Sequence, residues 1–167
     1  MESIVNEYEY TPEISAEAVG AWWQQKFRNG YITMIILIVL IPLMQILATF
    51  FIGRFRLLLA LEIFPIAVII LFRMKQSKAI QTERERMEVL FQNGTFVYRI
   101  ELASEIHTIS SKGENRIKYE DVEGFRETRN LIVLFLKGSM TLALHKEGFQ
   151  KGSAEECTDF LKKKISI

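Results

Sequence analysis

The chain has 167 residues, of which 49% are hydrophobic and 25% are charged, and its formal net charge is +1. From Lys78 onward it carries fifteen Lys or Arg and fourteen Asp or Glu, so this half has no excess charge for binding a phosphate backbone, and we expect no nucleic-acid partner. The single cysteine excludes an internal disulfide and fits a reducing compartment. With only two histidines in the chain in addition, a structural zinc site is not expected.

Residues 1–30 are predicted to form a strand and a helix. Residues 7–10 alternate as in a short strand, and Thr11, Pro12 and Glu13 then have the order of an N-cap, a first-turn proline and an acidic first turn. The helix should run to about Asn29. Near its end, Trp22 and Trp23 either form an interfacial belt with the cations beside them or pack against the soluble domain.

Residues 31–73 are predicted to form a transmembrane helical hairpin. Residues 31–52 contain no charged side chain, and as a helix they would rise about 33 Å, which matches a hydrocarbon core of about 30 Å. Residues 57–72 are shorter, about 24 Å, but are apolar on every side rather than along one stripe. Only four residues separate the two runs, so the helices must be antiparallel.

The cations at the ends of the two runs predict the orientation in the cell membrane. They are Lys26, Arg28, Arg73, Lys75 and Lys78 outside the hairpin and Arg54 and Arg56 in its turn. Five against two places both termini in the cytoplasm, because cytoplasmic loops are enriched in Lys and Arg. We take these cations, without Lys78, and the two tryptophans as candidate anchors at the membrane interface.

Glu62 is the one acidic residue predicted to lie inside the membrane. In an antiparallel hairpin it lies at a depth where Gln45 and Thr49 can reach it by hydrogen bonds. Those groups could satisfy a protonated or interface-near glutamate, or Glu62 could form a polar contact with a second protomer or a partner's helix. Both alternatives are open from sequence.

The rest of the chain is predicted to be a stalk followed by a small β domain. Residues 74–86 extend the second helix or begin a linker. In residues 87–167, six or seven short strands follow one another between turns, beginning with residues 87–91 and an Asn93-Gly94 turn, which favours an antiparallel sandwich or barrel. A helix capped by Ser153, with Lys162, Lys163 and Lys164 in its last turn, should close one end or face.

A set of mainly hydrophobic and turn residues punctuates this C-terminal part. They are Phe96, Glu101, Ile106, Gly113, residues 117–122, Glu127, residues 144–149, Phe160 and Leu161. This pattern resembles the YcxB-like bacterial membrane proteins, although His145 stands where that family tends to have proline. The resemblance implies an N-terminal segment, a two-helix hairpin and a pleckstrin-homology-like C-terminal domain. It implies no catalytic residues, since the activity of that family is largely uncharacterised.

We find no converging groups of the kind that an enzyme needs. His107 is expected to be an exposed strand residue, His145 to end a strand, and Cys157 to be a small buried hydrophobe. We therefore expect no catalytic residue, cofactor, metal or small-molecule substrate.

The sequence favours a membrane-anchored binding or scaffold protein, whose partners are the lipid bilayer and a protein or a second copy of the chain. Docking is expected at an exposed strand edge or in a groove beside the C-terminal helix. One alternative is an immunity protein against a membrane-active peptide, by analogy alone. A more distant alternative is an oligomeric pore or transporter subunit that uses Glu62.

Overall fold

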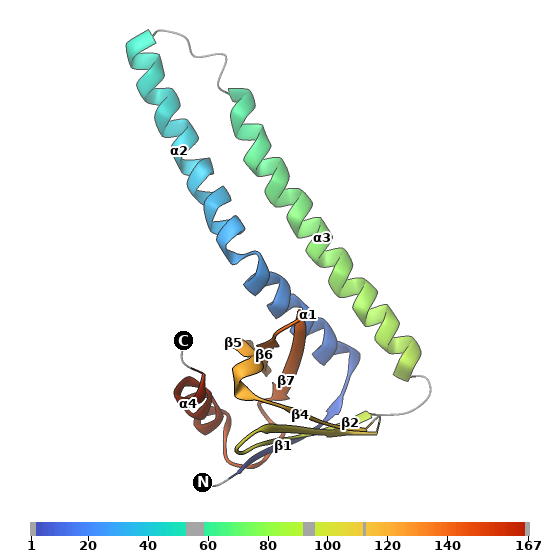
Figure 1. The fold of residues 1–167 in the computed structure, drawn as a ribbon. Helices are drawn as coiled ribbons and strands as arrows, with labels where there is room; N and C mark the ends of the chain where they lie inside the picture. The colour runs from blue at the N-terminus through green and yellow to red at the C-terminus, as the bar shows by residue number, and fades with distance from the viewer. Residues whose placement is uncertain (1–2, 53–58, 92–95, 112, 166–167) are drawn as a thin grey trace. The chain divides into compact units, whose positions relative to one another are not determined.

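The computed structural model describes residues 3–52, 59–91, 96–111 and 113–165. The chain is an α+β protein with two compact units (Figure 1). One unit contains the residues up to Trp22 together with those from Ile80 onward, and the other runs from Trp23 to Ala79. We call them the β unit and the helical unit.

The described residues form four α-helices and eight strands. The helices are α1 (Pro12–Lys26), α2 (Arg28–Ile52), α3 (Leu59–Phe91) and α4 (Ala154–Lys164), with a 3-10 turn at Tyr119–Asp121. The strands are β1 (Ile4–Tyr10), β2 (Phe96–Leu102), β3 (Ile106–Ser110), β4 (Gly113–Ile117), β5 (Val122–Glu127), β6 (Leu131–Leu136), β7 (Met140–His145) and β8 (Phe149–Lys151).

The β unit contains two antiparallel sheets that share one hydrophobic core. The larger sheet has the order β4-β3-β2-β1-β8 and the smaller has the order β5-β6-β7. All six residues of β6 are buried, because this strand is central in its sheet and is apolar throughout. Helix α4 packs on the same core through Cys157 and Leu161, both fully buried.

Strand β1 comes from the N-terminal segment but lies inside the larger sheet. It pairs with β2 along its whole length, from Ile4 opposite Leu102 to Tyr10 opposite Phe96, and with β8 on its other side. The sequence predicted a strand here without its partners. Residues 3–22 are therefore part of the β unit.

The turns and caps of the β unit follow the predicted pattern. Gly138 and Ser139, between β6 and β7, have positive φ angles of 79° and 65°, and such angles are typical of tight turns. At the start of α4 the Ser153 hydroxyl accepts a hydrogen bond from the Glu156 amide at 3.2 Å. The cap at Ser153 confirms a sequence prediction.

The sequence predicted a strand at residues 87–91, and this prediction is wrong. These residues form the last turn of α3. The helix continues through them because the residues before and within this segment are mostly good helix formers. An ion pair of 3.4 Å between Arg84 and Glu88, four residues apart, also stabilises it. Residues 74–86 lie within the same helix, so they extend it as a stalk. The predicted Asn93-Gly94 turn lies outside the described residues.

In the helical unit, α2 runs antiparallel to the first part of α3 (Figure 1). Pro42 lies inside α2. No single helix in the described part of the chain is long and apolar enough to cross a membrane alone, but Pro12–Lys26 and Arg28–Met44, bent by 59° between them, reach that length and composition as a pair.

Candidate functional site

Helix α2 exposes large apolar side chains around most of its described surface. Those at least a third exposed are Ile32, Ile35, Ile36, Leu37, Val39, Leu40, Leu43, Met44, Ile46 and Leu47. At 100° per residue they cover about 200° of the helix circumference. An amphipathic helix of a water-soluble protein turns its apolar stripe inward, so this arrangement is the reverse of what water favours.

Helix α3 continues this surface in the same unit. Ile66, Ile70, Leu71 and Met74 are each about half exposed or more. After Phe72 the sequence becomes cationic with Arg73, which marks the end of the predicted apolar run.

The described cationic anchors lie at the end of α1, at the start of α2 and in the middle of α3. Lys26, Arg28, Arg73 and Lys75 are all exposed. Arg73 donates a hydrogen bond from Nη2 to the Tyr31 hydroxyl at 3.3 Å, and its guanidinium carbon lies 5.7 Å from the centre of the Tyr31 ring. Arg54 and Arg56 lie outside the described residues.

The two tryptophans have different neighbours. Trp22 packs against the core of the β unit. Trp23 belongs to the helical unit, where its ring stacks on Phe27 at 4.9 Å and meets the edge of Phe72 at 5.7 Å. The predicted packing against the C-terminal domain therefore holds for Trp22, while the predicted interfacial belt stays a prediction.

The predicted intramembrane contact concerns side chains that the structure does not describe. The backbone of Gln45 and Thr49 belongs to α2 and that of Glu62 to α3, but the side chains of these three residues lie outside the described part. Both alternatives for Glu62, and the pore function that depends on it, stay predictions.

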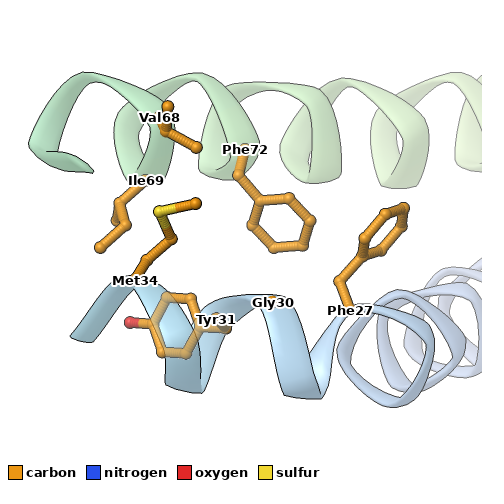
Figure 2. Close-up of a pocket in the computed structure, with 7 residues that line it drawn as sticks. All are labelled: Phe27, Gly30, Tyr31, Met34, Val68, Ile69 and Phe72. Carbon is orange, nitrogen blue, oxygen red and sulfur yellow. The ribbon is translucent and has the colours of Figure 1, made fainter. Parts of the chain in front are cut away.

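An apolar cavity of about 150 Å³ lies between α2 and α3 (Figure 2). Its lining residues are Phe27, Gly30, Tyr31, Met34, Val68, Ile69 and Phe72. Sequence reasoning missed it. An added Cβ at Gly30 would meet no atom within 4 Å, so the small size of this residue helps to keep the space open.

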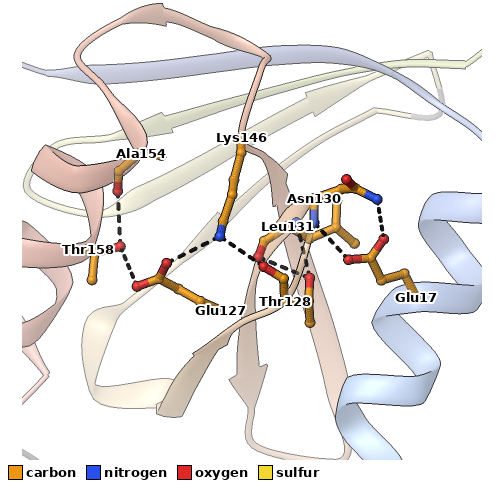
Figure 3. Close-up of polar contacts among 8 residues, drawn as sticks. All are labelled: Glu17, Glu127, Thr128, Asn130, Leu131, Lys146, Ala154 and Thr158. Carbon is orange, nitrogen blue, oxygen red and sulfur yellow. Dashed lines mark hydrogen bonds and ion pairs between the residues drawn. The ribbon is translucent and has the colours of Figure 1, made fainter.

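A polar depression of about 510 Å³ lies beside α4 in the β unit. Lys146 is central to it: its ammonium donates to the Thr128 carbonyl at 2.8 Å and lies 3.3 Å from Glu127 Oε2 (Figure 3). Thr158 on α4 donates to Glu127 Oε1 at 3.3 Å. Acidic and basic side chains, Glu155, Asp159 and Lys162, complete the lining. The groove beside the C-terminal helix that the sequence suggested as a docking place has this mixed-charge surface.

Helix α1 is joined to the turn between β5 and β6 by Glu17. Its carboxylate accepts hydrogen bonds from the Asn130 backbone amide at 3.0 Å and from Asn130 Nδ2 at 2.9 Å (Figure 3). Burial alone would raise the pKa of Glu17, but hydrogen bonds from Thr128 and Asn130 outweigh it and lower the pKa. Glu17 is thus an ionised structural contact that fixes α1 to the smaller sheet.

The surroundings of the two histidines and the cysteine indicate structural roles. His107 Nε2 is shielded from solvent and lies 3.4 Å from Glu114 Oε2, so this histidine is less exposed than the sequence suggested. His145 Nδ1 accepts a hydrogen bond from the Glu147 amide. Burial raises the pKa of the Cys157 thiol to about 12, which keeps it protonated and unreactive near neutral pH. Among the described residues no group of three or more His, Cys, Asp or Glu is arranged to hold a metal ion.

Comparison with known proteins identifies one part of the chain. The model of the YcxB-like protein family matches residues 103–161, from the turn after β2 to the buried face of α4. No curated protein and no solved structure matches the chain. The resemblance to the YcxB-like protein family is therefore confirmed, over residues 103–161.

Proposed function

We propose that this protein is a non-catalytic, membrane-anchored binding protein. Residues 31–73 form a transmembrane hairpin in the cell membrane, and the β unit is a pleckstrin-homology-like module that binds a partner protein or a second copy at the cytoplasmic surface. The observation that carries the proposal is the outward-facing apolar surface of α2, from Ile32 to Leu47.

The energies involved favour insertion of α2. Full burial of a Val, Leu, Ile or Met side chain stabilises by about 1.5–3 kcal/mol. Ten such side chains on α2, each roughly half exposed, would gain on the order of 10 kcal/mol on leaving water. The cost of placing Glu62 at depth is about 2.5–3.5 kcal/mol on insertion scales, so the apolar surface outweighs it.

The cations support the proposed orientation. Lys26 and Arg28 precede the apolar run and Arg73 and Lys75 follow it, which suits contact with anionic headgroups at one membrane surface. Both chain termini then lie in the cytoplasm.

The build of the β unit supports a binding role. Two antiparallel sheets enclose a common core, α4 closes part of it, and the depression beside α4 presents charges of both signs. A tether to the membrane raises the effective concentration of this module for any other membrane component, so a surface of modest affinity is sufficient.

Alkaline extraction and cysteine labelling test the membrane part. We expect the full-length protein to stay with membranes washed at alkaline pH and to leave them only with detergent. Cys157 gives a low labelling background because it is buried and its pKa is raised. A cysteine introduced by Arg56→Cys should therefore react with a membrane-impermeant maleimide on intact cells, while Lys162→Cys should react only after lysis. Release at alkaline pH would overturn the membrane anchor, and the opposite labelling pattern would overturn the orientation.

Photo-crosslinking tests the binding part. A photoreactive amino acid replaces Asp159 in the groove, and the matched control replaces Lys137, an exposed residue at the turn after β6. We expect an adduct from the Asp159 position alone, with twice the mass of the chain if the partner is a second copy. Equal adducts from both positions, or none from either, would contradict docking beside α4.

A further inference from the structure

The cavity between α2 and α3 has an apolar interior, and a cationic residue, Arg73, is hydrogen-bonded to one of its lining side chains, Tyr31. Figure 2 shows Met34 reaching from α2 toward α3 and Phe72 reaching from α3 toward α2, with no polar atom of either in the space between them. A space of about 150 Å³ with such an apolar lining is large enough for a benzene-sized apolar group. Its volume suits a short length of an acyl chain.

Arg73 and Tyr31 supply the polar side of this site. Tyr31 lines the cavity, and its hydroxyl accepts the hydrogen bond from Arg73 Nη2. The Arg73 guanidinium lies beside the cavity, because its carbon is 5.7 Å from the ring centre of Tyr31, a lining residue. A guanidinium presents several donors in a plane and binds phosphate oxygens in pairs, which an exposed Arg on an aromatic ring is well placed to do.

The charge of the surrounding segment selects the sign of the ligand. Between Trp23 and Ala79 the cations include Lys26, Arg28 and Arg73, whereas Glu62 is the one acidic residue of that segment. Gly30 and Tyr31 stand where the uncharged run begins, which in the proposed orientation is the depth of the lipid headgroups.

We propose that this cavity is a binding site for one anionic phospholipid of the cytoplasmic leaflet. Part of an acyl chain occupies the space beside Gly30, and the phosphate contacts Arg73 and the Tyr31 hydroxyl. The inference rests on the proposed membrane anchor and adds to it a specific lipid and the residues that select that lipid.

Trp23 provides a built-in reporter, because its ring contacts Phe27 and Phe72, both of which line the cavity. The full-length protein with Trp22→Phe, which leaves Trp23 as the only tryptophan, is reconstituted into vesicles of phosphatidylcholine. Either phosphatidylglycerol or phosphatidylcholine with brominated acyl chains is then added at increasing mole fraction, and quenching of Trp23 fluorescence is measured at each step.

We expect brominated phosphatidylglycerol to quench at about fivefold lower mole fraction than brominated phosphatidylcholine, the ratio given by one favourable contact between a cation and an anionic lipid. Gly30→Leu should remove the preference by filling the cavity without a backbone clash, since its Cβ meets open space. Arg73→Gln should remove it by removing the charge. Ile36→Phe, which adds apolar bulk on the exposed face away from the cavity, should keep it.

Equal quenching by the two lipids in the parent Trp22→Phe protein, or a preference that survives Gly30→Leu, would overturn the lipid site. Flotation of the same samples separates this failure from that of the membrane anchor. A protein that floats with the vesicles but shows no preference keeps its anchor and lacks the site, whereas a protein that does not float fails both proposals. Circular dichroism of each variant confirms that helix content is retained.

Discussion

Asn6 joins the N-terminal strand to the smaller sheet through both polar atoms of its side chain. It is fully buried in β1, and its side-chain amide takes the place of a backbone pairing with β7. Asn6 Nδ2 donates to the His145 carbonyl at 2.7 Å, and Asn6 Oδ1 accepts from the His145 amide at 3.1 Å. One side chain thus satisfies both backbone groups of a residue in the other sheet.

The substitution Asn6→Ala should lower the free energy of unfolding of the β unit by about 1–3 kcal/mol. It leaves the backbone amide of His145 without its partner, and a polar group shielded from water costs about this much when it is unpaired. The His145 carbonyl keeps a second donor, the Gly148 amide at 3.0 Å. A domain is stable by about 5–15 kcal/mol in total, so the loss is large enough to measure easily. Glu9→Ala, at an exposed position of the same strand, should change the stability by less than about 0.5 kcal/mol.

Urea unfolding of the full-length protein in mild detergent measures this difference. With Trp23→Phe in the background, the remaining Trp22 packs against the core of the β unit and its fluorescence follows that unit. An Asn6→Ala protein that unfolds within about 0.5 kcal/mol of its parent would refute the assignment of Asn6 as the bridge between the sheets. A loss of the same size in Glu9→Ala would refute it as well, because the effect would then belong to the strand and not to the amide.

The same assay checks two further residues, and thiol labelling checks a third. Leu161→Ala on α4 should lower the free energy of unfolding by about 2–5 kcal/mol, because this side chain is fully buried. Lys163→Ala, on the exposed face of the same helix, should lower it by less than about 0.5 kcal/mol. Equal effects would contradict the packing of α4. Ser139→Gly should raise the stability by about 1 kcal/mol, since Ser139 holds a φ of 65° that a side chain disfavours, and a decrease would exclude strain at this turn. At pH 8, maleimide should label Cys157 roughly a thousandfold more slowly in the folded than in the unfolded protein, because a pKa of about 12 against the ordinary 9.0 leaves far less thiolate. The raised pKa also means that the contribution of Cys157 to stability is present below pH 9 and is lost as the pH rises toward 12, so Cys157→Ala should remove that part of the alkaline loss.

Features of the β unit that depend on neighbours in sequence were predictable. Three features depend only on residues close in sequence: the alternation in β2 and β3, the continuous apolar run of β6 and the N-cap at Ser153. Residues 87–91 misled the prediction because Met, Leu and Phe suit a strand as well as a helix, and only the helix that precedes them decides between the two.

The missed features depend on residues far apart in sequence. The partners of β1 in β2 follow it by about ninety residues, and nothing in residues 4–10 records which strand they will join. Gly148 is a second example. A Cβ there would lie 2.9 Å from the Glu7 carbonyl oxygen, so glycine is needed because β1 passes close to it. The sequence around Gly148 does not show this contact. The lipid cavity was hidden for another reason, because Gly30 contributes by having no side chain, and an absent group leaves no hydrophobic pattern.

The exposed surface of α2 could be covered by lipid or by another protein, and its geometry favours lipid. A partner protein would have to wrap about 200° of the helix to cover the side chains from Ile32 to Leu47, whereas a bilayer surrounds a helix without any such fit. The end of that surface also coincides with Tyr31 and Arg73, an aromatic ring and a cation that suit the headgroup boundary. Alkaline carbonate separates the two cases, since it strips proteins held by other proteins and leaves membrane-spanning helices in place.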